Sequence, residues 1–382
     1  MYWQGHLEIK KYHRRTIFSA DVVHIRLLIV AKLLDAGLIH HIMPKSKMPE
    51  VDEISIVRDD SGPAIPKVTY YCPPKFLAGI PSLLVFAKVI IALKLSLVKR
   101  PDMIISYAMY PHGFIAFMVA KLTRRPLIIC VISNHEMDAF GTFFPQLYLS
   151  ILKRTSFITT TGSKTREKLI TRGISSDKIL ILPHAVETDR FYPSGTDKVY
   201  DVLYVGRLAE KKHPDTLLKA LSRIKKFSKK DITLCIAGTG SPAYEDYLKK
   251  IILDLDLTGN VTFPGFIDNT APLYNQSRMY VLPTEAEGLP FTILEAMACG
   301  VPVITTGAGD MTDTVRNSVN ALVIDRYDDI AAFSTGIRVL LEDAELYNRI
   351  RDNGMEEIFH HHRKEHVMAT WREIFTGLKE KG

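Results

Sequence analysis

Short apolar segments alternate with longer amphipathic segments along most of the chain. The apolar segments are rich in β-branched residues and bounded by turn residues, which is typical of strands. Because they are continuously apolar, they predict parallel sheets covered by helices on both faces. The first series of strands is expected at residues 101–107, 126–132, 156–161 and 178–184, with helices at 110–122, 140–153 and 163–172.

The same rhythm starts again after a polar segment at residues 187–201. Two series predict an α/β fold of two Rossmann-like domains, residues 1–190 and 191–359, with a ligand-binding cleft between them. A helix at about 360–382 is expected to return to the first domain. Strands of the second series are expected at 200–208, 232–240, 260–266, 278–284, 301–307 and 321–325, with helices near 215–227, 242–255, 270–276, 291–299, 310–316 and 328–342.

Length, composition and net charge indicate the class of protein and the kind of partner it binds. A length of 382 residues fits two domains, and 47% hydrophobic with 24% charged residues is typical of a globular protein. The four cysteines show no paired spacing, which argues against a zinc site or a disulfide framework. A net charge of +7 favours an anionic partner. We expect no nucleic acid, because aromatic residues do not interleave with the basic ones.

The sequence also bears on location. No signal-peptide pattern and no uninterrupted run of about 20 apolar residues occurs, so we expect a cytoplasmic protein. The longest apolar segment, residues 82–100, is interrupted by Lys88 and Lys94. It is interpreted either as a core-facing helix or as a basic, apolar surface that places the protein on the anionic inner face of the cell membrane.

Two carboxylates lie beside a strongly apolar segment, TEAEGLPFTILEAMACGVPV, at residues 284–303. Glu287 precedes the helix expected at 291–299, and Glu295 lies about one turn inside it. The N–H groups around Gly288 form an anion site at the helix start, and carboxylates accept hydrogen bonds from sugar hydroxyls. Together they fit a nucleotide sugar, although two glutamates alone are more often solvated surface charges.

Further polar residues follow two expected strands. Gly206 and Arg207 end the strand at 200–208, and Lys212 precedes the next helix, so two cations are placed to neutralise a diphosphate. An ordinary basic loop is the alternative. Gly238 and Gly240 follow the next strand in a Gly-x-Gly pattern, which is too short for a dinucleotide fingerprint and more typical of a tight turn.

Taken in order, these motifs resemble the retaining glycosyltransferases of family 4, within group 1, which have the two-domain GT-B fold. The resemblance is carried by Gly-Arg with a following Lys, Gly-x-Gly-x-Pro, VTFPGF, YVLPT and a Glu-x7-Glu run that continues as EAMACGVPVI. It extends back through ILILPHAVETDRFYP to PDMIISYAMYPHGF and covers residues 101–347.

The resemblance implies roles for the matching residues. Arg207 and Lys212 hold the donor diphosphate and stabilise the departing nucleotide, Glu295 holds the ribose, and Glu287 faces the donor hexose as a catalytic residue. Further donor contacts are implied for Gly206, Gly238, Gly240, Ile267, Gly288, Leu289, Pro290 and Phe291.

The implied reaction moves a hexose or N-acetylhexosamine from a nucleotide diphosphate sugar to a glycan or lipid-linked acceptor, in cell-envelope polysaccharide or glycolipid biosynthesis. The configuration is retained, the diphosphate takes the acceptor proton, and no metal or other cofactor is required. Two alternatives remain open: a nucleotide-sugar epimerase of the same fold, and a non-catalytic nucleotide-sugar-binding subunit.

The first half departs from the family pattern. Ile132 stands where many members have histidine, so the nearby His135 is the catalytic candidate for the donor-sugar pocket and Asn134 a candidate for acceptor binding. A loop histidine without a role is the alternative for His135. His112 is a second acceptor candidate at the cleft edge, and His184, where asparagine is usual, is expected to be structural between the domains.

The N-terminal region is also atypical for the family. Residues 14–20 are expected as a cramped first strand, and residues 21–45 as the first helix and second strand. Either the Gly-rich loop after the first strand is expected to be shortened, or the sequence is expected to begin late in this region.

Overall fold

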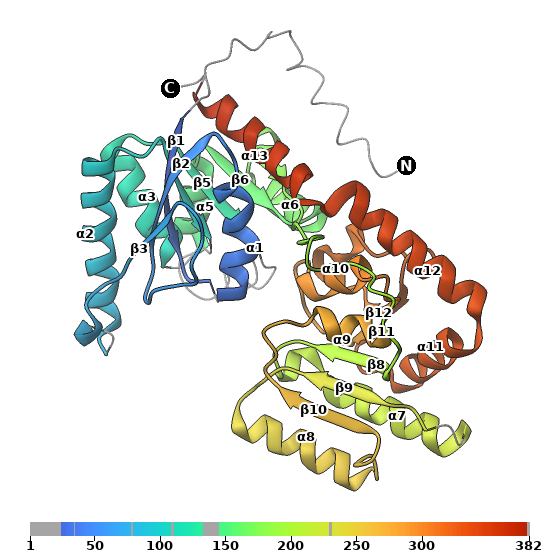
Figure 1. Cartoon of the computed structure of the whole chain (residues 1–382). Helices are drawn as coiled ribbons and strands as arrows, with labels where there is room; N and C mark the ends of the chain where they lie inside the picture. Colours follow the sequence, from blue (N-terminus) through green and yellow to red (C-terminus); the bar gives the residue numbers. More distant parts are fainter. Residues whose placement is uncertain are drawn as a thin grey trace.

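The structure consists of two parallel β-sheets with helices packed on their faces (Figure 1). The computed structural model describes residues 24–33, 35–77, 79–107, 111–132, 145–228 and 231–379. Every strand pair within these ranges is parallel. The predicted α/β class with two Rossmann-like sheets is confirmed.

The first sheet, which defines the first domain, has seven strands within the described residues, in the order β3-β2-β1-β4-β5-β6-β7. Every residue of β4 and β5 is buried, as expected for strands covered on both faces. The strands are β1 (Ile25–Ala31), β2 (Val51–Val57), β3 (Val68–Tyr71), β4 (Met103–Tyr107), β5 (Leu127–Val131), β6 (Phe157–Thr160) and β7 (Ile179–Ile181).

The assignment expected for the N-terminal region is wrong in part. Residues 25–31, expected within the first helix and second strand, form the strand β1, and α1 (Asp35–Ser46) is the helix that follows. The physical reason is that β1 lacks a polar stripe: its last five residues are all buried, which suits a central strand and not a helix with a solvent-facing side. Residues 14–20 lie outside the described residues.

Helices cover both faces of the first sheet. Helix α2 packs along α3, and together they form the outer layer on one side, whereas α1 lies on the other side (Figure 1). The remaining helices of this domain are shorter. The bounds are α2 (Pro81–Lys99), α3 (His112–Thr123), α5 (Pro145–Arg154) and α6 (Ser163–Thr171), with 3-10 turns η3 (Lys75–Leu77) and η5 (Ser176–Lys178).

The second sheet, which defines the second domain, has six strands within the described residues, in the order β10-β9-β8-β11-β12-β13. The direction of winding reverses between β8 and β11, which is where open α/β sheets bind ligands. The strands are β8 (Tyr200–Val205), β9 (Leu234–Ala237), β10 (Val261–Gly265), β11 (Ser277–Leu282), β12 (Val303–Thr306) and β13 (Leu322–Ile324). The helices are α7 (Pro214–Ser228), α8 (Pro242–Asp254), α9 (Ala271–Asn275), α10 (Phe291–Ala298) and α11 (Ile330–Glu342), with 3-10 turns η6 (Glu210–Lys212) and η7 (Gly309–Asp313).

The C-terminal segment crosses from the second domain to the first (Figure 1). After α12 (Ala344–Glu357) a π-helical turn, η8 (Ile358–His362), redirects the chain into α13 (Lys364–Lys379). Trp371 and Phe375 of α13 are 1% exposed and belong to the same apolar core as β1 and α1. The first domain therefore contains residues from both ends of the described chain.

The two sheets direct the carboxyl ends of their strands toward each other. Thr161, which follows β6, donates a 2.6 Å hydrogen bond to Asp310 in η7. Gly288, which follows β11, packs so closely on the Ile132 carbonyl after β5 that a Cβ at this position would lie 2.8 Å from the oxygen. Loops from both domains therefore meet at the cleft.

Candidate active site

The loops after β8 and β11 meet at the point where the winding of the second sheet reverses. The backbone N–H of Glu285 donates to the Lys211 carbonyl at 3.0 Å, and the Thr284 hydroxyl donates to the same oxygen at 3.1 Å. These bonds fix the basic loop after β8 against the acidic loop after β11. The sequence-predicted cations and carboxylates are thereby brought to one edge of the sheet.

Lys212 and Glu287 form an ion pair across these two loops, with side chains 18% and 15% exposed. Burial, together with the neighbouring Arg207 guanidinium, lowers the pKa of Lys212 to about 8. Arg207 itself is exposed, directly beyond Gly206 at the end of β8. Two cations and one carboxylate therefore lie together, and the exposed arginine is the member most accessible to a ligand.

Glu295 lies on α10 and is 6% exposed. Its Oε2 accepts a 2.9 Å hydrogen bond from the Tyr274 hydroxyl, and its Oε1 lies 3.5 Å from Nε2 of His40 in the first domain. Burial and the adjacent carboxylate raise the pKa of Tyr274, so its hydroxyl remains a donor. Glu295 is thus a buried acceptor with one partner from each domain.

The start of α10 is built around Phe291. Its ring is stacked between the rings of His40 at 3.9 Å and His184 at 4.1 Å. Nδ1 of His184 donates to the Leu289 carbonyl at 2.7 Å, and Pro290 is the N-cap residue in an extended conformation. The predicted donor loop is therefore anchored on the first domain through aromatic and imidazole rings.

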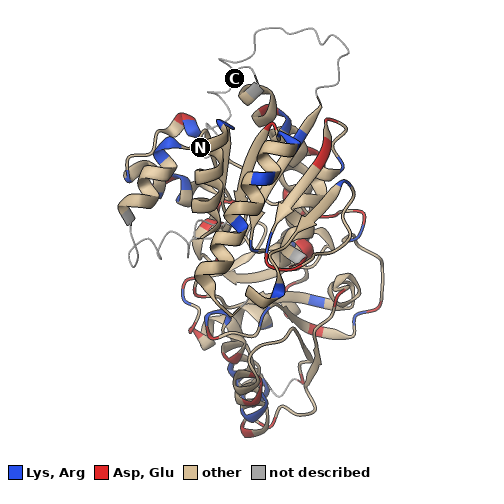
Figure 2. Cartoon of the chain, turned by 90° about the vertical axis from the view of Figure 1, so that its left-hand side faces the viewer, with Lys and Arg blue, Asp and Glu red and all other residues tan. Residues whose placement is uncertain are grey.

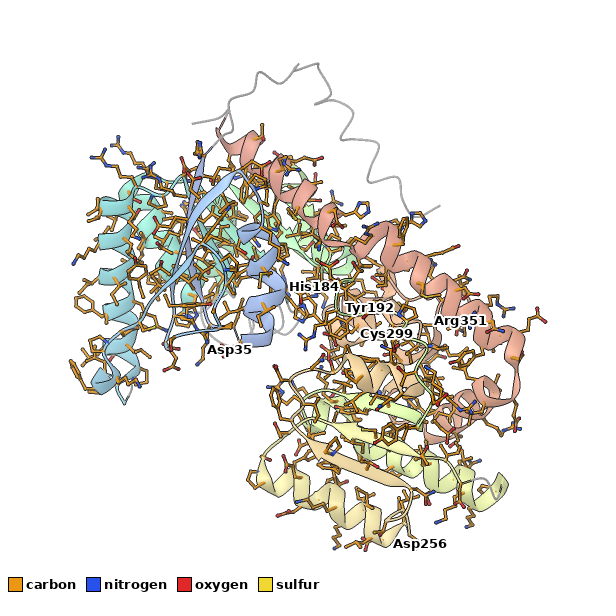
Figure 3. The ribbon with its side chains drawn as sticks, in the orientation of Figure 1. Asp35, His184, Tyr192, Asp256, Cys299 and Arg351 are labelled. Carbon is orange, nitrogen blue, oxygen red and sulfur yellow. The ribbon has the colours of Figure 1, made fainter. Side chains whose placement is uncertain are left out.

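His184 lies at the junction of the two domains, whereas Asp256 lies at the far end of the second domain (Figure 3). The His184 carbonyl accepts from Nδ1 of His362 at 3.0 Å, which ties the segment after β7 to the π-helical turn η8. Burial lowers the pKa of His184 to about 3 and that of His362 to about 4, so both are neutral at pH 7. These contacts make His184 a structural residue of the interdomain segment.

Gly238 and Gly240 serve close backbone packing. A Cβ on Gly238, whose φ is +145°, would lie 1.9 Å from the Gly206 carbonyl oxygen. A Cβ on Gly240 would lie 2.3 Å from the Leu208 carbonyl oxygen. The two glycines therefore position the loop that carries Arg207. Ile267, the predicted contact for the nucleotide base, is half-buried beside the second-domain core.

His112 is not at the cleft surface where the sequence placed it. It is 1% exposed at the start of α3, and its Nε2 lies 3.2 Å from Nζ of Lys88, which forms an ion pair with Asp59. Burial and the nearby Lys88 ammonium lower the pKa of His112 to about 4. The reason is that α2 covers the start of α3. Asn134 and His135 lie outside the described residues.

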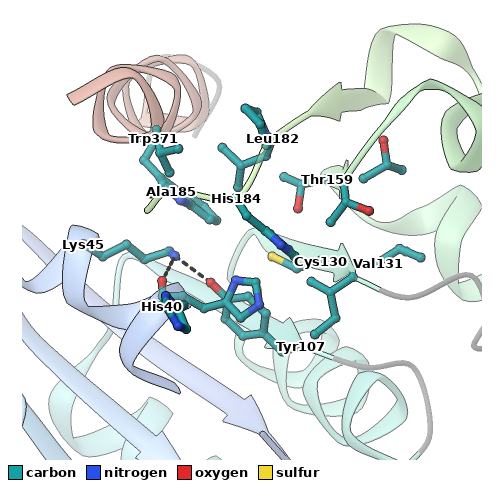
Figure 4. A pocket seen from close by; sticks show the side chains of 16 residues that line it. His40, Lys45, Tyr107, Cys130, Val131, Thr159, Leu182, His184, Ala185 and Trp371 are labelled. Carbon is teal, nitrogen blue, oxygen red and sulfur yellow. Dashed lines mark hydrogen bonds between the residues drawn. The ribbon is translucent and has the colours of Figure 1, made fainter. Parts of the chain in front are cut away.

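Side chains on α1 that the sequence did not single out line a small pocket together with residues of β4, β5, β6 and α13 (Figure 4). Lys45 is 1% exposed and donates to the Tyr107 hydroxyl and to the His41 carbonyl, each at 2.6 Å. Its ammonium lies 3.9 Å from the centre of the Trp371 ring. Burial lowers the pKa of Lys45 to about 7. The adjacent histidines His40 and His41 are the signal in the sequence for this group, and both lie on α1.

Comparisons with known proteins agree with this geometry. Residues 186–357 match the family Glycosyl transferases group 1. The chain is similar to the lipopolysaccharide core biosynthesis glycosyltransferase LpsE of Rhizobium meliloti (strain 1021), with 25% identity over 68% of this chain and 71% of that protein. It is also similar to a GDP-mannose-dependent alpha-(1-6)-phosphatidylinositol monomannoside mannosyltransferase of Mycobacterium tuberculosis, with 28% identity over 54% of this chain and 58% of that enzyme.

Other curated relatives are matched over about half of their length or less, as for the D-inositol 3-phosphate glycosyltransferase of Acidothermus cellulolyticus at 45%. Among solved structures, Anabaena HepE in complex with UDP and glucose superposes with a TM-score of 0.79 at 17% identity, over 92% of this chain and all of that one. The structural likeness shows the fold. The family match and the relatives indicate that the protein is a glycosyltransferase. Residues 186–357 thus form a group 1 glycosyltransferase domain, and the described chain has the GT-B fold.

Proposed function

We propose that the protein is a retaining glycosyltransferase of family 4 that moves a hexose or N-acetylhexosamine from a nucleotide diphosphate sugar. The acceptor is a glycan or a lipid-linked molecule at the inner face of the cell membrane, in cell-envelope polysaccharide or glycolipid biosynthesis. The observation that carries the proposal is the placement of Arg207, Lys212 and Glu287 together at the reversal point of the second sheet. Relatives named for lipopolysaccharide core and phosphatidylinositol mannoside synthesis support the acceptor class.

When the donor binds, Glu287 and Glu295 exchange their partners within the protein for hydroxyl groups of the donor. The diphosphate competes with Glu287 for Lys212 and recruits the exposed Arg207, because a doubly charged group outcompetes one carboxylate for a partly buried ammonium. Glu287 is then able to accept hydrogen bonds from the hexose hydroxyls. Glu295 accepts in the same way from the ribose, which takes the place of the His40 ring beside Oε1.

The chemistry follows from charge development. When the bond between the anomeric carbon and the diphosphate oxygen breaks, negative charge grows on the diphosphate, and fixed cations stabilise it most at that moment. The acceptor oxygen bonds to the anomeric carbon from the same side, so the configuration is retained, and its proton passes to the departing diphosphate. Because Arg207 and Lys212 supply the positive charge, the proposed reaction requires no metal.

The experiment is the release of nucleotide from a panel of UDP-, GDP- and ADP-sugars. Wild type is compared with Glu287→Ala and with the matched control Glu285→Ala, whose carboxylate lies two residues away in the same loop and is 49% exposed. We expect one donor to be turned over by wild type and the control, and about 100-fold more slowly by Glu287→Ala.

Three outcomes would contradict the proposal. Tight donor binding with no nucleotide release, even with membrane extracts as a source of acceptor, would indicate a binding subunit. Isomerised sugar nucleotide formed without any acceptor would indicate an epimerase. Equal loss of activity in Glu287→Ala and Glu285→Ala would show that Glu287 has no specific role toward the donor hexose.

A further inference from the structure

Helix α2 is the outermost helix of the first domain (Figure 1). Its inner face buries Ala92 and Leu95 together with two polar side chains, Lys88 and Ser96. Lys88 pairs with Asp59 and contacts His112, and the Ser96 hydroxyl donates to the Thr123 hydroxyl at 2.9 Å. Polar side chains of α2 thus face the protein.

The outer face of α2 is apolar. Its exposed side chains recur at the three- and four-residue spacing that defines one side of a helix. Among the described residues, α2 is the one helix long and apolar enough to cross a membrane by composition, yet only 22% of its apolar stretch is buried. The exposed apolar residues on α2 and the turn before it are Phe76, Ile80, Leu83, Phe86, Ile90, Leu97 and Val98, with exposed fractions from 43% to 82%.

The exposed charged residues on α2 and α3 have one sign. Neither α2 nor its neighbour α3 contains an acidic residue. Figure 2 views the molecule from this side and marks the positions of Lys and Arg. The exposed basic residues of η3, α2, α3 and their C-caps form no ion pair with a described residue: Lys75, Lys94, Arg100, Lys121 and Arg124.

We propose that the outer face of α2, with η3, docks on an anionic lipid surface, so that α2 lies in the plane of the membrane interface. Apolar side chains enter the boundary between headgroups and acyl chains, and the lysines and arginines contact lipid phosphates. Lys88 with its buried ion pair, and the packing of α2 on α3, keep the helix attached to the domain rather than across the bilayer.

A lipid surface fits this face better than a protein partner does. Each exposed Lys or Arg gains from a negative membrane surface without needing a matched carboxylate. A second copy of the chain would bring its own α2 with the same positive charges, and the two sets would repel each other.

The proposed membrane docking is argued from α2 alone. The conclusion about the acceptor also rests on the proposed function. The helix follows β3 and η3, so it begins at the carboxyl edge of the first sheet, which is the edge that faces the second domain, and runs away from that edge. Docking through α2 therefore brings the acceptor side of the cleft to the membrane surface, which selects a lipid-anchored acceptor over a free glycan.

The test is co-sedimentation of the full chain with phosphatidylcholine vesicles that contain, or lack, phosphatidylglycerol. We expect binding to the anionic vesicles that weakens with added salt. The double substitution Phe86→Gln and Ile90→Gln should lower the ratio of bound to free protein at least about tenfold. The matched control is Leu253→Gln on α8, where an apolar side chain of the second domain is 67% exposed.

The proposal is overturned if wild type stays free of anionic vesicles at low salt, or if the double variant binds as well as the control. Light scattering that shows a dimer, lost in the double variant, would assign the face to a second copy instead. Release of nucleotide from donor without vesicles is measured on the same variants. If the double variant still releases nucleotide but does not bind vesicles, only the docking is lost and the proposed transferase chemistry is intact.

Discussion

Buried neutral histidines make the fold sensitive to acid. Burial is the main cause that lowers the pKa of His184 to about 3 and those of His112 and His362 to about 4, against an ordinary value of 6.5. Each ring binds a proton more readily in the unfolded chain than in the folded one. The stability that these groups provide is therefore complete above pH 6.5 and is lost as the pH falls toward 4.

The magnitude follows from the difference in proton binding. At pH 5 an unfolded histidine is mostly protonated, whereas these three remain mostly neutral in the folded chain. Each therefore lowers the free energy of unfolding by about 2 kcal/mol relative to pH 7.5. Together they remove about 6 kcal/mol, which is comparable to the whole stability of many domains. Glu357, whose pKa is raised by burial, acts in the opposite direction near pH 5 and offsets part of this loss.

The assay is urea unfolding followed by circular dichroism at a series of pH values from 7.5 to 4.5. We expect the free energy of unfolding to fall steeply below pH 6.5. His184→Asn retains an amide donor for the Leu289 carbonyl, and it should reduce the pH slope by about a quarter, because burial also lowers the pKa of His41. A free energy of unfolding that is constant between pH 7 and pH 5 would refute the reasoning, as would an unchanged slope in His184→Asn.

Three further predictions concern single side chains. Glu295→Gln should weaken nucleotide binding about tenfold with little change in turnover of saturating donor, as measured by calorimetry and nucleotide release; a lower turnover with unchanged affinity would contradict the ribose role. Gly238→Ala, whose Cβ meets the Gly206 carbonyl, should lower the free energy of unfolding by about 3 kcal/mol, whereas Gly259→Ala, with open space around it, should change it little. Wild-type stability should rise from pH 7 to pH 9 by about 2 kcal/mol from Lys45, whose pKa is lowered to about 7, and by about 1 kcal/mol from Lys212, whose pKa is lowered to about 8, because the folded chain loses both protons first. Lys45→Met should remove most of this rise, and an identical rise in the variant would show that Lys45 is not its source.

The pattern of apolar residues was sufficient to predict the buried strands and the loops that follow them. Continuous apolar runs located β4, β5, β8 and β11, because a strand buried on both faces needs no polar position. The loops that carry Arg207, Lys212 and Glu287 followed from the rule that parallel strands bring their carboxyl ends to one edge.

What the sequence did not reveal depends on contacts between distant segments. The stacking of Phe291 between His40 and His184 joins the start of α10, helix α1 and the segment after β7, which are far apart in the chain, and no spacing rule encodes it. The run at residues 25–31 is short enough to suit either a helix or a strand, and only its burial on both faces decided the assignment. His112 looked exposed because the cover that α2 provides is a tertiary feature.

The apolar segment at residues 82–100 posed a different difficulty. Its hydrophobicity was plain, but a core helix and an interfacial helix have the same composition. Only the direction in which Lys88 and Ser96 point distinguishes them, and direction requires the packed domain.

The central claim is that the edge between β8 and β11 binds the diphosphate of a nucleotide sugar. The most direct measurement is calorimetric titration with UDP, GDP and ADP of wild type, Arg207→Ala and the matched control Arg223→Ala, which removes an exposed arginine on α7. We expect one nucleotide to bind wild type and the control equally, and to bind Arg207→Ala about 10- to 100-fold more weakly, because a charge-assisted hydrogen bond is lost. Equal affinity in all three proteins, or no affinity of wild type for any nucleotide, would contradict it.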